Sequence, residues 1–322
     1  MLQLQLPGPR RMSRAAAVLS PLLAMSLVVF AASAQDTTVP SEDLRAALAK
    51  ADAGDGADLL KLADGGRADA QAYAGIMLIF GRGTIAADPR RGCAYAEKAS
   101  ASRPEAVYMT GECYRRGLNG PPDMAKAKAA FTRADQMGFP KAKCALGEMQ
   151  MAEPGGGAQG LELCKTAAKA GDHDAQMKVA ETYRKGGPVA ADPAEARKWY
   201  QMAADRQDPE AARVLGEMYA KGEGGKKDTK KALSLWQAAE KAGDPLAPIL
   251  VADQLFSEMT GGKTPGPGQY AFRGGIPVAD IDAISDWYRQ ALERDPRPDV
   301  KKRAQTALNV LASFKTAAKS NP

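Results

Sequence analysis

Small and apolar residues recur at helical spacing in the segment 209–244, which holds two such stripes joined by a glycine-rich turn. In the first stripe they occupy positions i, i+4, i+5 and i+8, at Ala211, Leu215, Gly216 and Tyr219. At about 100° per residue these positions share one face of a helix. The second stripe follows the turn and consists of Ala232, Leu235, Trp236 and Ala239. The pattern predicts two short helices whose apolar faces need cover from neighbouring elements.

The pattern of segment 209–244 recurs along most of the chain. Counterparts of Ala211 lie at Ala70, Ala106, Ala142, Ala175 and Ala247, so successive copies are 36, 36, 33, 36 and 36 residues apart. A fixed period of this length predicts a stack of helical hairpins, in which each copy covers the apolar face of the next. We therefore expect about six repeats, which begin at residues 69, 104, 140, 173, 209 and 245.

Two other positions of the repeat predict close contact between its helices. Gly216 recurs as Gly75, Gly111 and Gly147, and as Ala180 and Ala252 in the remaining copies. Because glycine inside a helix costs roughly 1 kcal/mol relative to alanine, its recurrence indicates a packing requirement. The position of Trp236 recurs as Tyr95, Phe131, Cys164, Tyr200 and Tyr288.

These residues resemble the Sel-one-like repeat, a relative of the tetratricopeptide repeat. The shared pattern is A-x-x-x-L-G-x-x-Y-x-x-G-x-G, followed by D-x-x-K-A-x-x-x-W-x-x-A-A, and segments 173–208 and 209–244 match it best. The third repeat departs from it, because MAEPGGGAQG shortens the turn, and so does the sixth. The resemblance implies an all-α fold, a right-handed α-solenoid of antiparallel helix hairpins, and non-catalytic protein binding. It names no partner.

The pattern also predicts how the chain is organised. Residues 35–68 are expected to form N-terminal capping helices, residues 69–296 the repeats, and residues 297–322 a C-terminal capping helix. A glycine- and proline-rich run at 260–277 interrupts the last hairpin and is expected to be a surface loop. Solenoids need capped ends for solubility, and we expect a monomer.

The first 34 residues do not share the repeat pattern. Three arginines within residues 10–14 precede an apolar run over residues 15–32, and small residues occupy positions 32–34. These features are typical of a secretory signal peptide that is cleaved after Ala34. An uncleaved membrane anchor is the alternative, although Pro21 interrupts a run that is already short for a span. We expect a periplasmic or secreted protein with no transmembrane segment in its mature chain.

The charge balance argues against nucleic-acid binding. The chain has 44 lysine and arginine residues against 38 aspartate and glutamate residues, a formal charge of +6. Cleavage after Ala34 removes three arginines and no acid, which leaves 41 − 38 = +3. A nucleic-acid site requires a strong basic patch. The basic pairs Arg115-Arg116, Lys226-Lys227 and Lys230-Lys231 are expected to complement helix dipoles or to stay solvated.

Four cysteines in an exported chain invite disulfide formation. Cys93 and Cys113 are 20 residues apart, and so are Cys144 and Cys164. Each pair should stand at equal height on two antiparallel helices, which is necessary for a disulfide but not sufficient. We favour 93–113 with 144–164 among the three possible connectivities, and free buried thiols remain the alternative.

No catalytic, cofactor-binding or metal-binding motif stands out. The sequence holds no Ser-x-x-Lys motif and no His-Glu-x-x-His motif, and His173 is its only histidine. A single histidine without spaced partners is a weak metal signal, so the sequence predicts no metal and no cofactor. The end of a phosphate-binding loop is imitated at residues 261–264, but Ser257 stands where that loop requires glycine.

One position of the first helices is acidic in five successive repeats: Glu112, Glu148, Glu181, Glu217 and Asp253. This position, i+6, points away from the apolar stripe. The resemblance implies that first helices line a concave face, where the carboxylates would form a ladder for a basic or amide-rich extended partner. The alternative is that they only stabilise their own helices.

That alternative rests on the residues four positions further on. Arg116, Lys185 and Lys221 follow Glu112, Glu181 and Glu217 at this spacing, and each pair stabilises a helix by roughly 0.2–0.5 kcal/mol. Glu148 and Asp253 have no such neighbour, and we expect them to be free for a partner.

The loop at 260–277 is a second candidate site. Tyr270, Phe272 and Arg273 are residue types that anchor interfaces. A tolerated surface insertion is the alternative.

The leading functional hypothesis is an exported, non-catalytic scaffold that binds a protein of the bacterial envelope. Some cysteine-rich members of the resembling family are described as penicillin-binding proteins or weak β-lactamases, which makes a hydrolase the first alternative. A part in a polysaccharide secretion or regulatory complex is the second.

Overall fold

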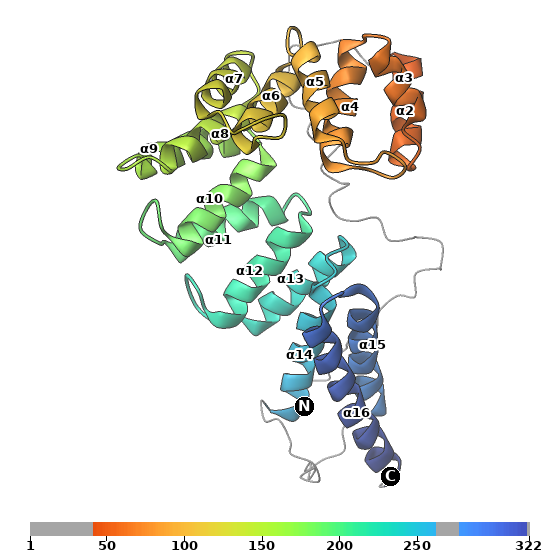
Figure 1. Ribbon diagram of the computed structural model, residues 1–322. Helices are drawn as coiled ribbons and strands as arrows, with labels where there is room; N and C mark the ends of the chain where they lie inside the picture. Colours follow the sequence, from red (N-terminus) through yellow and green to blue (C-terminus); the bar gives the residue numbers. More distant parts are fainter. Residues whose placement is uncertain (1–40, 262–276, 321–322) are drawn as a thin grey trace. The chain divides into compact units, whose positions relative to one another are not determined.

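Residues 41–261 and 277–320 are described by a computed structural model, and they form fifteen α-helices (Figure 1). Within these residues the only strand-like pairing is an isolated bridge between Arg82 and Ile85. The all-α prediction is therefore confirmed. The predicted signal peptide and the loop residues Tyr270, Phe272 and Arg273 lie outside the described residues.

The described helices fall into two compact units. The N-terminal unit, up to residue 191, contains α2 (Glu42–Asp52), α3 (Ala57–Asp64), α4 (Ala68–Phe80), α5 (Pro89–Ala99), α6 (Pro104–Arg116), α7 (Met124–Gln136), α8 (Pro140–Met151), α9 (Gly157–Lys169) and α10 (His173–Lys185). The C-terminal unit, from residue 192, contains α11 (Pro193–Ala204), α12 (Pro209–Lys221), α13 (Thr229–Lys241), α14 (Ala247–Thr260), α15 (Val278–Arg294) and α16 (Pro298–Ser320).

In the N-terminal unit the repeats form hairpins from α4 and α5, α6 and α7, and α8 and α9. Helices α2 and α3 cover the outer face of α4, as expected for an N-terminal cap. Their residues Leu44 and Leu59 are fully buried in one cluster with Ala70 and Ala74 of α4. Ser41 precedes α2 but makes no side-chain cap. Its hydroxyl instead accepts a hydrogen bond from Arg67 Nη2 at 2.7 Å.

In the C-terminal unit α12 pairs with α13, α14 with α15, and α16 packs on α15. One apolar cluster joins Trp236 of α13, Ile249 of α14, Trp287 of α15 and Phe314 of α16. Helix α16 thus closes the end of this unit, as the sequence predicts. Helix α14 begins at Ala247, two residues after Pro245, where the sixth repeat is expected to begin.

Aspartate side chains fix where the helices of the repeats begin. Four second helices are capped by Asp88, Asp123, Asp192 and Asp228, each of which accepts a hydrogen bond from the backbone N–H three residues on. An aspartate in this position satisfies an otherwise unpaired donor of the first turn. This explains the aspartate that opens the second half of the repeat pattern.

The recurring glycine marks the closest contact within each hairpin. A Cβ atom on Gly216 would lie 2.5 Å from Trp236 Nε1, and one on Gly111 would lie 2.5 Å from Phe131 Cε1. The aromatic ring of the second helix therefore rests on the bare backbone of the first. In the third repeat the contact is between backbones, since a Cβ on Gly160 would lie 2.3 Å from the carbonyl oxygen of Gly147.

Two disulfides staple the N-terminal unit. Cys93 of α5 is bonded to Cys113 of α6, which joins the first repeat to the second. Cys144 of α8 is bonded to Cys164 of α9, within the third repeat, and their Cα atoms are only 4.0 Å apart. These are the two pairs that the sequence spacing favours. In the third repeat a small cysteine takes the aromatic position, which permits the backbone contact.

We predict that Gly216→Ala destabilises the C-terminal unit by about 1–3 kcal/mol, because the new methyl group must displace the Trp236 ring. Urea unfolding followed by tryptophan fluorescence measures this, since Trp199, Trp236 and Trp287 all lie in that unit. The same substitution in a Trp236→Leu background should cost nothing further. An equal cost in both backgrounds would show that the ring is not the obstacle.

We predict that reduction destabilises the N-terminal unit alone, because both disulfides lie there. Each closes a loop of about 20 residues, which is worth about 3 kcal/mol in the chain-entropy description. Hydrogen exchange of α5, α6, α8 and α9 should accelerate on reduction, while the tryptophan-detected unfolding of the C-terminal unit stays unchanged. Unaltered exchange in those four helices would contradict a stabilising role of the disulfides.

Candidate protein-binding surface

A row of ion pairs crosses three first helices of the N-terminal unit. We call this set, Glu112 and Arg115 of α6, Glu148 of α8 and Lys178 of α10, the charged row. Arg115 makes a forked contact with Glu112, with nitrogen–oxygen distances of 3.0 and 2.8 Å. Its Nη1 also lies 3.9 Å from Glu148 Oε2, and Lys178 Nζ lies 2.9 Å from Glu148 Oε1. The charged row therefore links three successive repeats.

Exposure differs along the charged row. The side chain of Glu112 is only 10% exposed and carries a second cation, Arg116, whose Nε lies 3.2 Å from Oε2. Arg115, Glu148 and Lys178 are about one third exposed, with values of 32%, 32% and 37%. Partly exposed ion pairs contribute little to stability, roughly 0–1 kcal/mol, so a partner can compete for them. Three of the four side chains of the charged row are thus partly open to solvent.

The other carboxylates of the predicted ladder are also paired. Glu181 of α10 meets Lys185 at 2.5 Å, the expected pair one helical turn apart. Glu217 of α12 meets Arg213 at 2.9 Å, and Lys221 lies instead 3.7 Å from Glu223. The expected pair of Glu217 with Lys221 is therefore wrong, because the cation one turn earlier takes the carboxylate.

Asp253 of α14 sits in a small polar group of the C-terminal unit. Tyr288 of α15 donates its hydroxyl hydrogen to Asp253 Oδ1 at 2.9 Å, and Arg303 Nη2 of α16 lies 3.1 Å from Oδ2. Burial raises the pKa of Asp253, while Arg303 and Tyr288 act in the opposite direction. The carboxylate joins three helices at the end of the unit.

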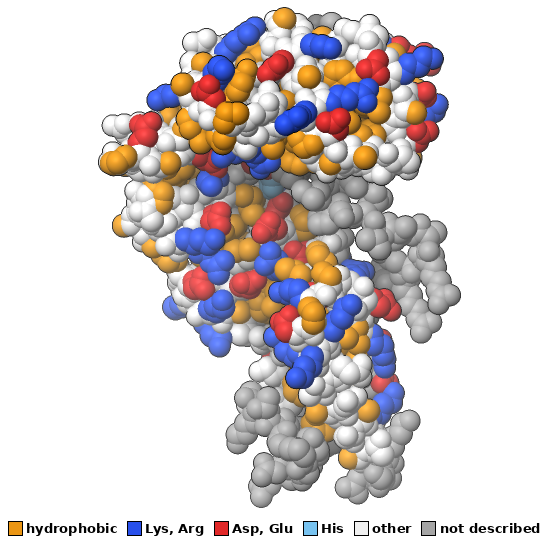
Figure 2. Space-filling model, viewed as in Figure 1, with side chains coloured by type: hydrophobic (Ala, Val, Ile, Leu, Met, Phe, Trp, Pro, Cys, Tyr) orange, Lys and Arg blue, Asp and Glu red, His pale blue; other side chains and the backbone are white. Residues whose placement is uncertain are grey.

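The expectation that Glu148 and Asp253 are free for a partner is therefore wrong. Both are engaged by residues from other helices, Lys178 and Arg303, which lie far away in the sequence. A search for partners along the same helix could not find them. On the face drawn in Figure 2, acidic and basic side chains are interspersed rather than gathered by sign. Each of the five carboxylates thus has a cation beside it, which argues against an acidic groove for a basic partner.

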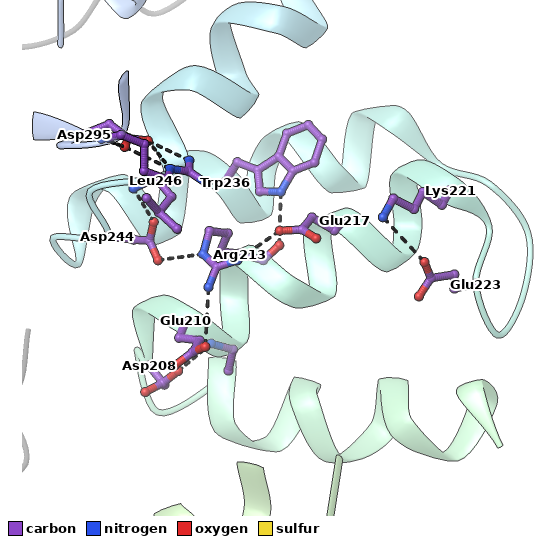
Figure 3. A network of polar contacts seen from close by, with 12 residues as sticks. Asp208, Glu210, Arg213, Glu217, Lys221, Glu223, Trp236, Asp244, Leu246 and Asp295 are labelled. Atoms are coloured by element: carbon purple, nitrogen blue, oxygen red, sulfur yellow. Dashed lines mark hydrogen bonds and ion pairs between the residues drawn. The ribbon is translucent and has the colours of Figure 1, made fainter. Parts of the chain in front are cut away.

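Arg213 of α12 is the centre of a second network, seen from close by in Figure 3. Its guanidinium contacts Asp244 Oδ2 at 2.9 Å, Glu217 at 2.9 Å and Glu210 at 3.4 Å. Its carbonyl oxygen accepts a hydrogen bond from Trp236 Nε1 at 3.1 Å. Burial raises the pKa of Asp244, and Arg213 lowers it. Because Arg213 and Asp244 are mostly buried, this network holds α12 to the segment before α14 rather than offering a docking surface.

Among the described residues, no group of three or more histidine, cysteine, aspartate or glutamate side chains is placed to hold a metal ion. None of the described helices combines the length and apolarity that crossing a bilayer requires.

Comparison with known families identifies the repeats. The model of the Sel1 repeat matches residues 68–102, 104–134, 173–208 and 209–244. The third and sixth hairpins, whose sequences depart from the pattern, are not matched although they fold as α8 with α9 and α14 with α15. No curated protein matches the chain.

One solved structure shows the same fold, and a second is similar to a lower degree. A Sel1 repeat protein from Oxalobacter formigenes is similar at a TM-score of 0.55 and 23% identity, over 78% of this chain and 99% of that one. A second, c5321, is a protective antigen of uropathogenic Escherichia coli strains with an SLR fold. It matches at a TM-score of 0.48 and 20% identity, over 82% of this chain and 64% of that chain.

We predict that Arg303→Gln lowers the free energy of unfolding of the C-terminal unit by about 0.5–1 kcal/mol at pH 7, and much less near pH 3. Arg303 lowers the pKa of Asp253, so its loss raises that pKa further and makes the ionised carboxylate costlier in the fold. Below about pH 4 the carboxyl is protonated in both states and the difference should vanish. Urea unfolding followed by tryptophan fluorescence at both pH values tests this.

The matched control is Arg289→Gln on α15, since Arg289 and its partner Asp286 are both at least half exposed. It should change stability less than Arg303→Gln does. A pH-independent effect of Arg303→Gln would mean that its packing, not its charge, is what matters.

Proposed function

The chain belongs to the Sel1 repeat family, whose members are generally non-catalytic scaffolds for protein interaction, and we propose that it is an exported scaffold that binds a protein of the bacterial envelope. The observation that carries the choice of surface is the charged row on α6, α8 and α10. It runs across three repeats, and three of its four side chains are partly exposed.

A partner suited to the charged row presents both signs of charge on a polar face. The exposed part of the row offers one carboxylate, Glu148, between two cations, Arg115 and Lys178. The neighbouring pair Glu181 and Lys185 is more exposed still, at 47% and 70%. Charges arranged in this way set the register and the specificity of an interface more than its affinity. A strongly basic or strongly acidic partner would find an unfavourable charge at every second position.

The N-terminal residues and the disulfides support the proposed cellular compartment. A basic start, an apolar core and small residues at 32–34 favour export and cleavage after Ala34. Two disulfides in the N-terminal unit suit an oxidising compartment. Both features support a periplasmic or secreted protein.

We predict that exchanging the charges of the neighbouring pair, Glu181→Lys with Lys185→Glu, removes the partner. The exchange keeps an ion pair on α10 but inverts its pattern, and the reversed order costs only a few tenths of a kcal/mol of helix stability. The measurement is affinity purification of the tagged wild-type and exchanged chains from native periplasm, with captured proteins identified by mass spectrometry.

The control is the corresponding exchange Asp286→Arg with Arg289→Asp on α15, a second helix of the C-terminal unit. This chain should capture the same partner as the wild type. If all three chains captured the partner equally, the binding surface would not be on the first helices. Absence of the chain from the periplasm would contradict the proposed export. Hydrolysis of nitrocefin by the pure chain would contradict the proposal that it is not catalytic.

A further inference from the structure

Four lysines stand together where α13 begins. Lys226 and Lys227 end the turn that follows α12, and Lys230 and Lys231 lie in the first turn of α13. All four are exposed, and none of their ammonium groups makes a hydrogen bond or an ion pair with a carboxylate of the described residues. We call these four residues the lysine cluster. The two nearby acids are engaged, Glu223 by Lys221 and Asp228 as the cap of α13.

The fold gains nothing from the lysine cluster. The N-terminal end of a helix carries partial positive charge, so cations there are unfavourable. Of the two alternatives for Lys226-Lys227 and Lys230-Lys231, the exposed side chains fit the solvated one, because both pairs lie at the wrong end of α13 to complement its dipole. The corresponding turn of the second repeat, residues 117–123, connects α6 to α7 with no basic residue. A turn between the two helices of a repeat therefore does not need lysine in order to form.

Contacts with α11 hold the turn that carries the lysine cluster in place. The Arg197 guanidinium of α11 stacks on the Tyr219 ring, with its central carbon 4.2 Å from the ring centre. The same guanidinium donates to the carbonyl oxygens of Met218, at 3.0 Å, and Lys226, at 3.4 Å. A Cβ atom at Gly224, whose φ is +75°, would lie 2.3 Å from the carbonyl oxygen of Pro193. The turn therefore rests closely on α11, and its lysines are presented from a fixed base.

The positive charge continues along α13. Lys230, Ser234, Gln237 and Lys241 lie on one side of this helix, because their spacings of four, three and four residues bring them nearly into line. Lys241 is exposed and lies in the last turn. The one acid of α13, Glu240, is paired with Arg294 at 2.9 Å. The exposed side of α13 is therefore a line of cations and neutral polar groups without a free carboxylate.

We infer that the lysine cluster and the adjoining side of α13 bind an extended acidic segment of a protein. The distance from Lys230 to Lys241 along the helix axis is about 16 Å, which about five residues of extended chain cover. Aspartate and glutamate side chains on such a segment meet the four ammonium groups without displacing an existing ion pair. This surface lies in the C-terminal unit, and it is independent of the charged row.

An anionic membrane is the competing ligand, and the structure favours the protein segment. Binding to a lipid surface is strengthened by apolar side chains that enter the bilayer. The exposed large apolar residues among the described ones are Phe80, Met124, Met137 and Met202, and none belongs to α13 or to the turn before it. A narrow line of charge also matches an extended chain better than a flat layer of headgroups.

The test uses fluorescein-labelled hexaglutamate and the full processed chain, with binding followed by fluorescence anisotropy. The cluster variant replaces Lys226, Lys227, Lys230 and Lys231 with glutamine. It should bind at least about tenfold more weakly than the wild type, because four exposed charge pairs are lost. Binding by the wild type should weaken as salt is added. The cluster variant should fold at least as well as the wild type, since it removes cations from a helix N-terminus, and circular dichroism checks this.

The control variant replaces four exposed lysines outside the cluster with glutamine and so has the same net charge as the cluster variant: Lys61, Lys169, Lys301 and Lys302. It should change peptide binding by less than about twofold if position matters and net charge does not. The chain that carries the exchange Glu181→Lys with Lys185→Glu should bind the peptide as the wild type does. The outcome of the partner-capture experiment therefore does not affect this test.

Equal loss by the cluster and control variants would overturn the inference, because net charge alone would then explain binding. So would a wild-type chain that ignores hexaglutamate but sediments with phosphatidylglycerol vesicles through the lysine cluster. That result would assign the surface to a membrane instead.

Discussion

Close approach of the two helices in each hairpin is the constraint on which the rest of the structure depends. In four of the six repeats the first helix carries glycine at the contact, and the two ways of filling the space are clearest in the second, third and fifth. In the second and fifth repeats an aromatic ring, Phe131 or Trp236, lies on glycine backbone. In the third repeat a second glycine and a cysteine bring the two backbones together. Both solutions bury apolar surface that a single hairpin cannot cover by itself.

Ion pairs add a second kind of link, between one repeat and the next. Lys178 contacts Glu148 across the fourth and third repeats, and Arg213 contacts Asp244 at the end of the fifth repeat, next to the start of the sixth. The two ion pairs differ in how far the carboxylate is buried. Burial raises the pKa of Asp244 in spite of Arg213, so the ionised carboxylate is held at some expense of stability at neutral pH. Glu148 is one third exposed, which leaves its pair with Lys178 accessible to a partner.

The sequence predicts the hairpins well because each helix carries its apolar stripe within about 13 residues. Ala211, Leu215 and Gly216 are buried where the spacing puts them, and aspartates cap the helices that the pattern begins with aspartate. The cysteine pairs favoured by equal height are the pairs that are bonded. These are local properties of one helix or of two helices joined by a short turn.

The state of the carboxylates could not be predicted in the same way. Glu148 and Asp253 are neutralised by Lys178 and Arg303, which lie 30 and 50 residues further along the chain and on other helices (178 − 148 = 30, 303 − 253 = 50). Helical spacing describes neighbours on one helix and says nothing about side chains that arrive from the next repeat. The length and rotamer of each cation decide which carboxylate it reaches, as Glu217 shows by pairing with Arg213 rather than with Lys221.

Comparison between repeats separates positions that build the fold from positions that do not. A residue needed for packing recurs, as glycine does at 75, 111, 147 and 216. Lys226 and Lys227 of the lysine cluster stand on a turn that the second repeat makes without a basic residue, and all four lysines lie at a helix end that disfavours cations. The charged row is intermediate, because its carboxylates recur while their partners change from helix to helix. Because the repeated framework is common to every copy, the residues that differ between copies are the ones left to distinguish one partner from another.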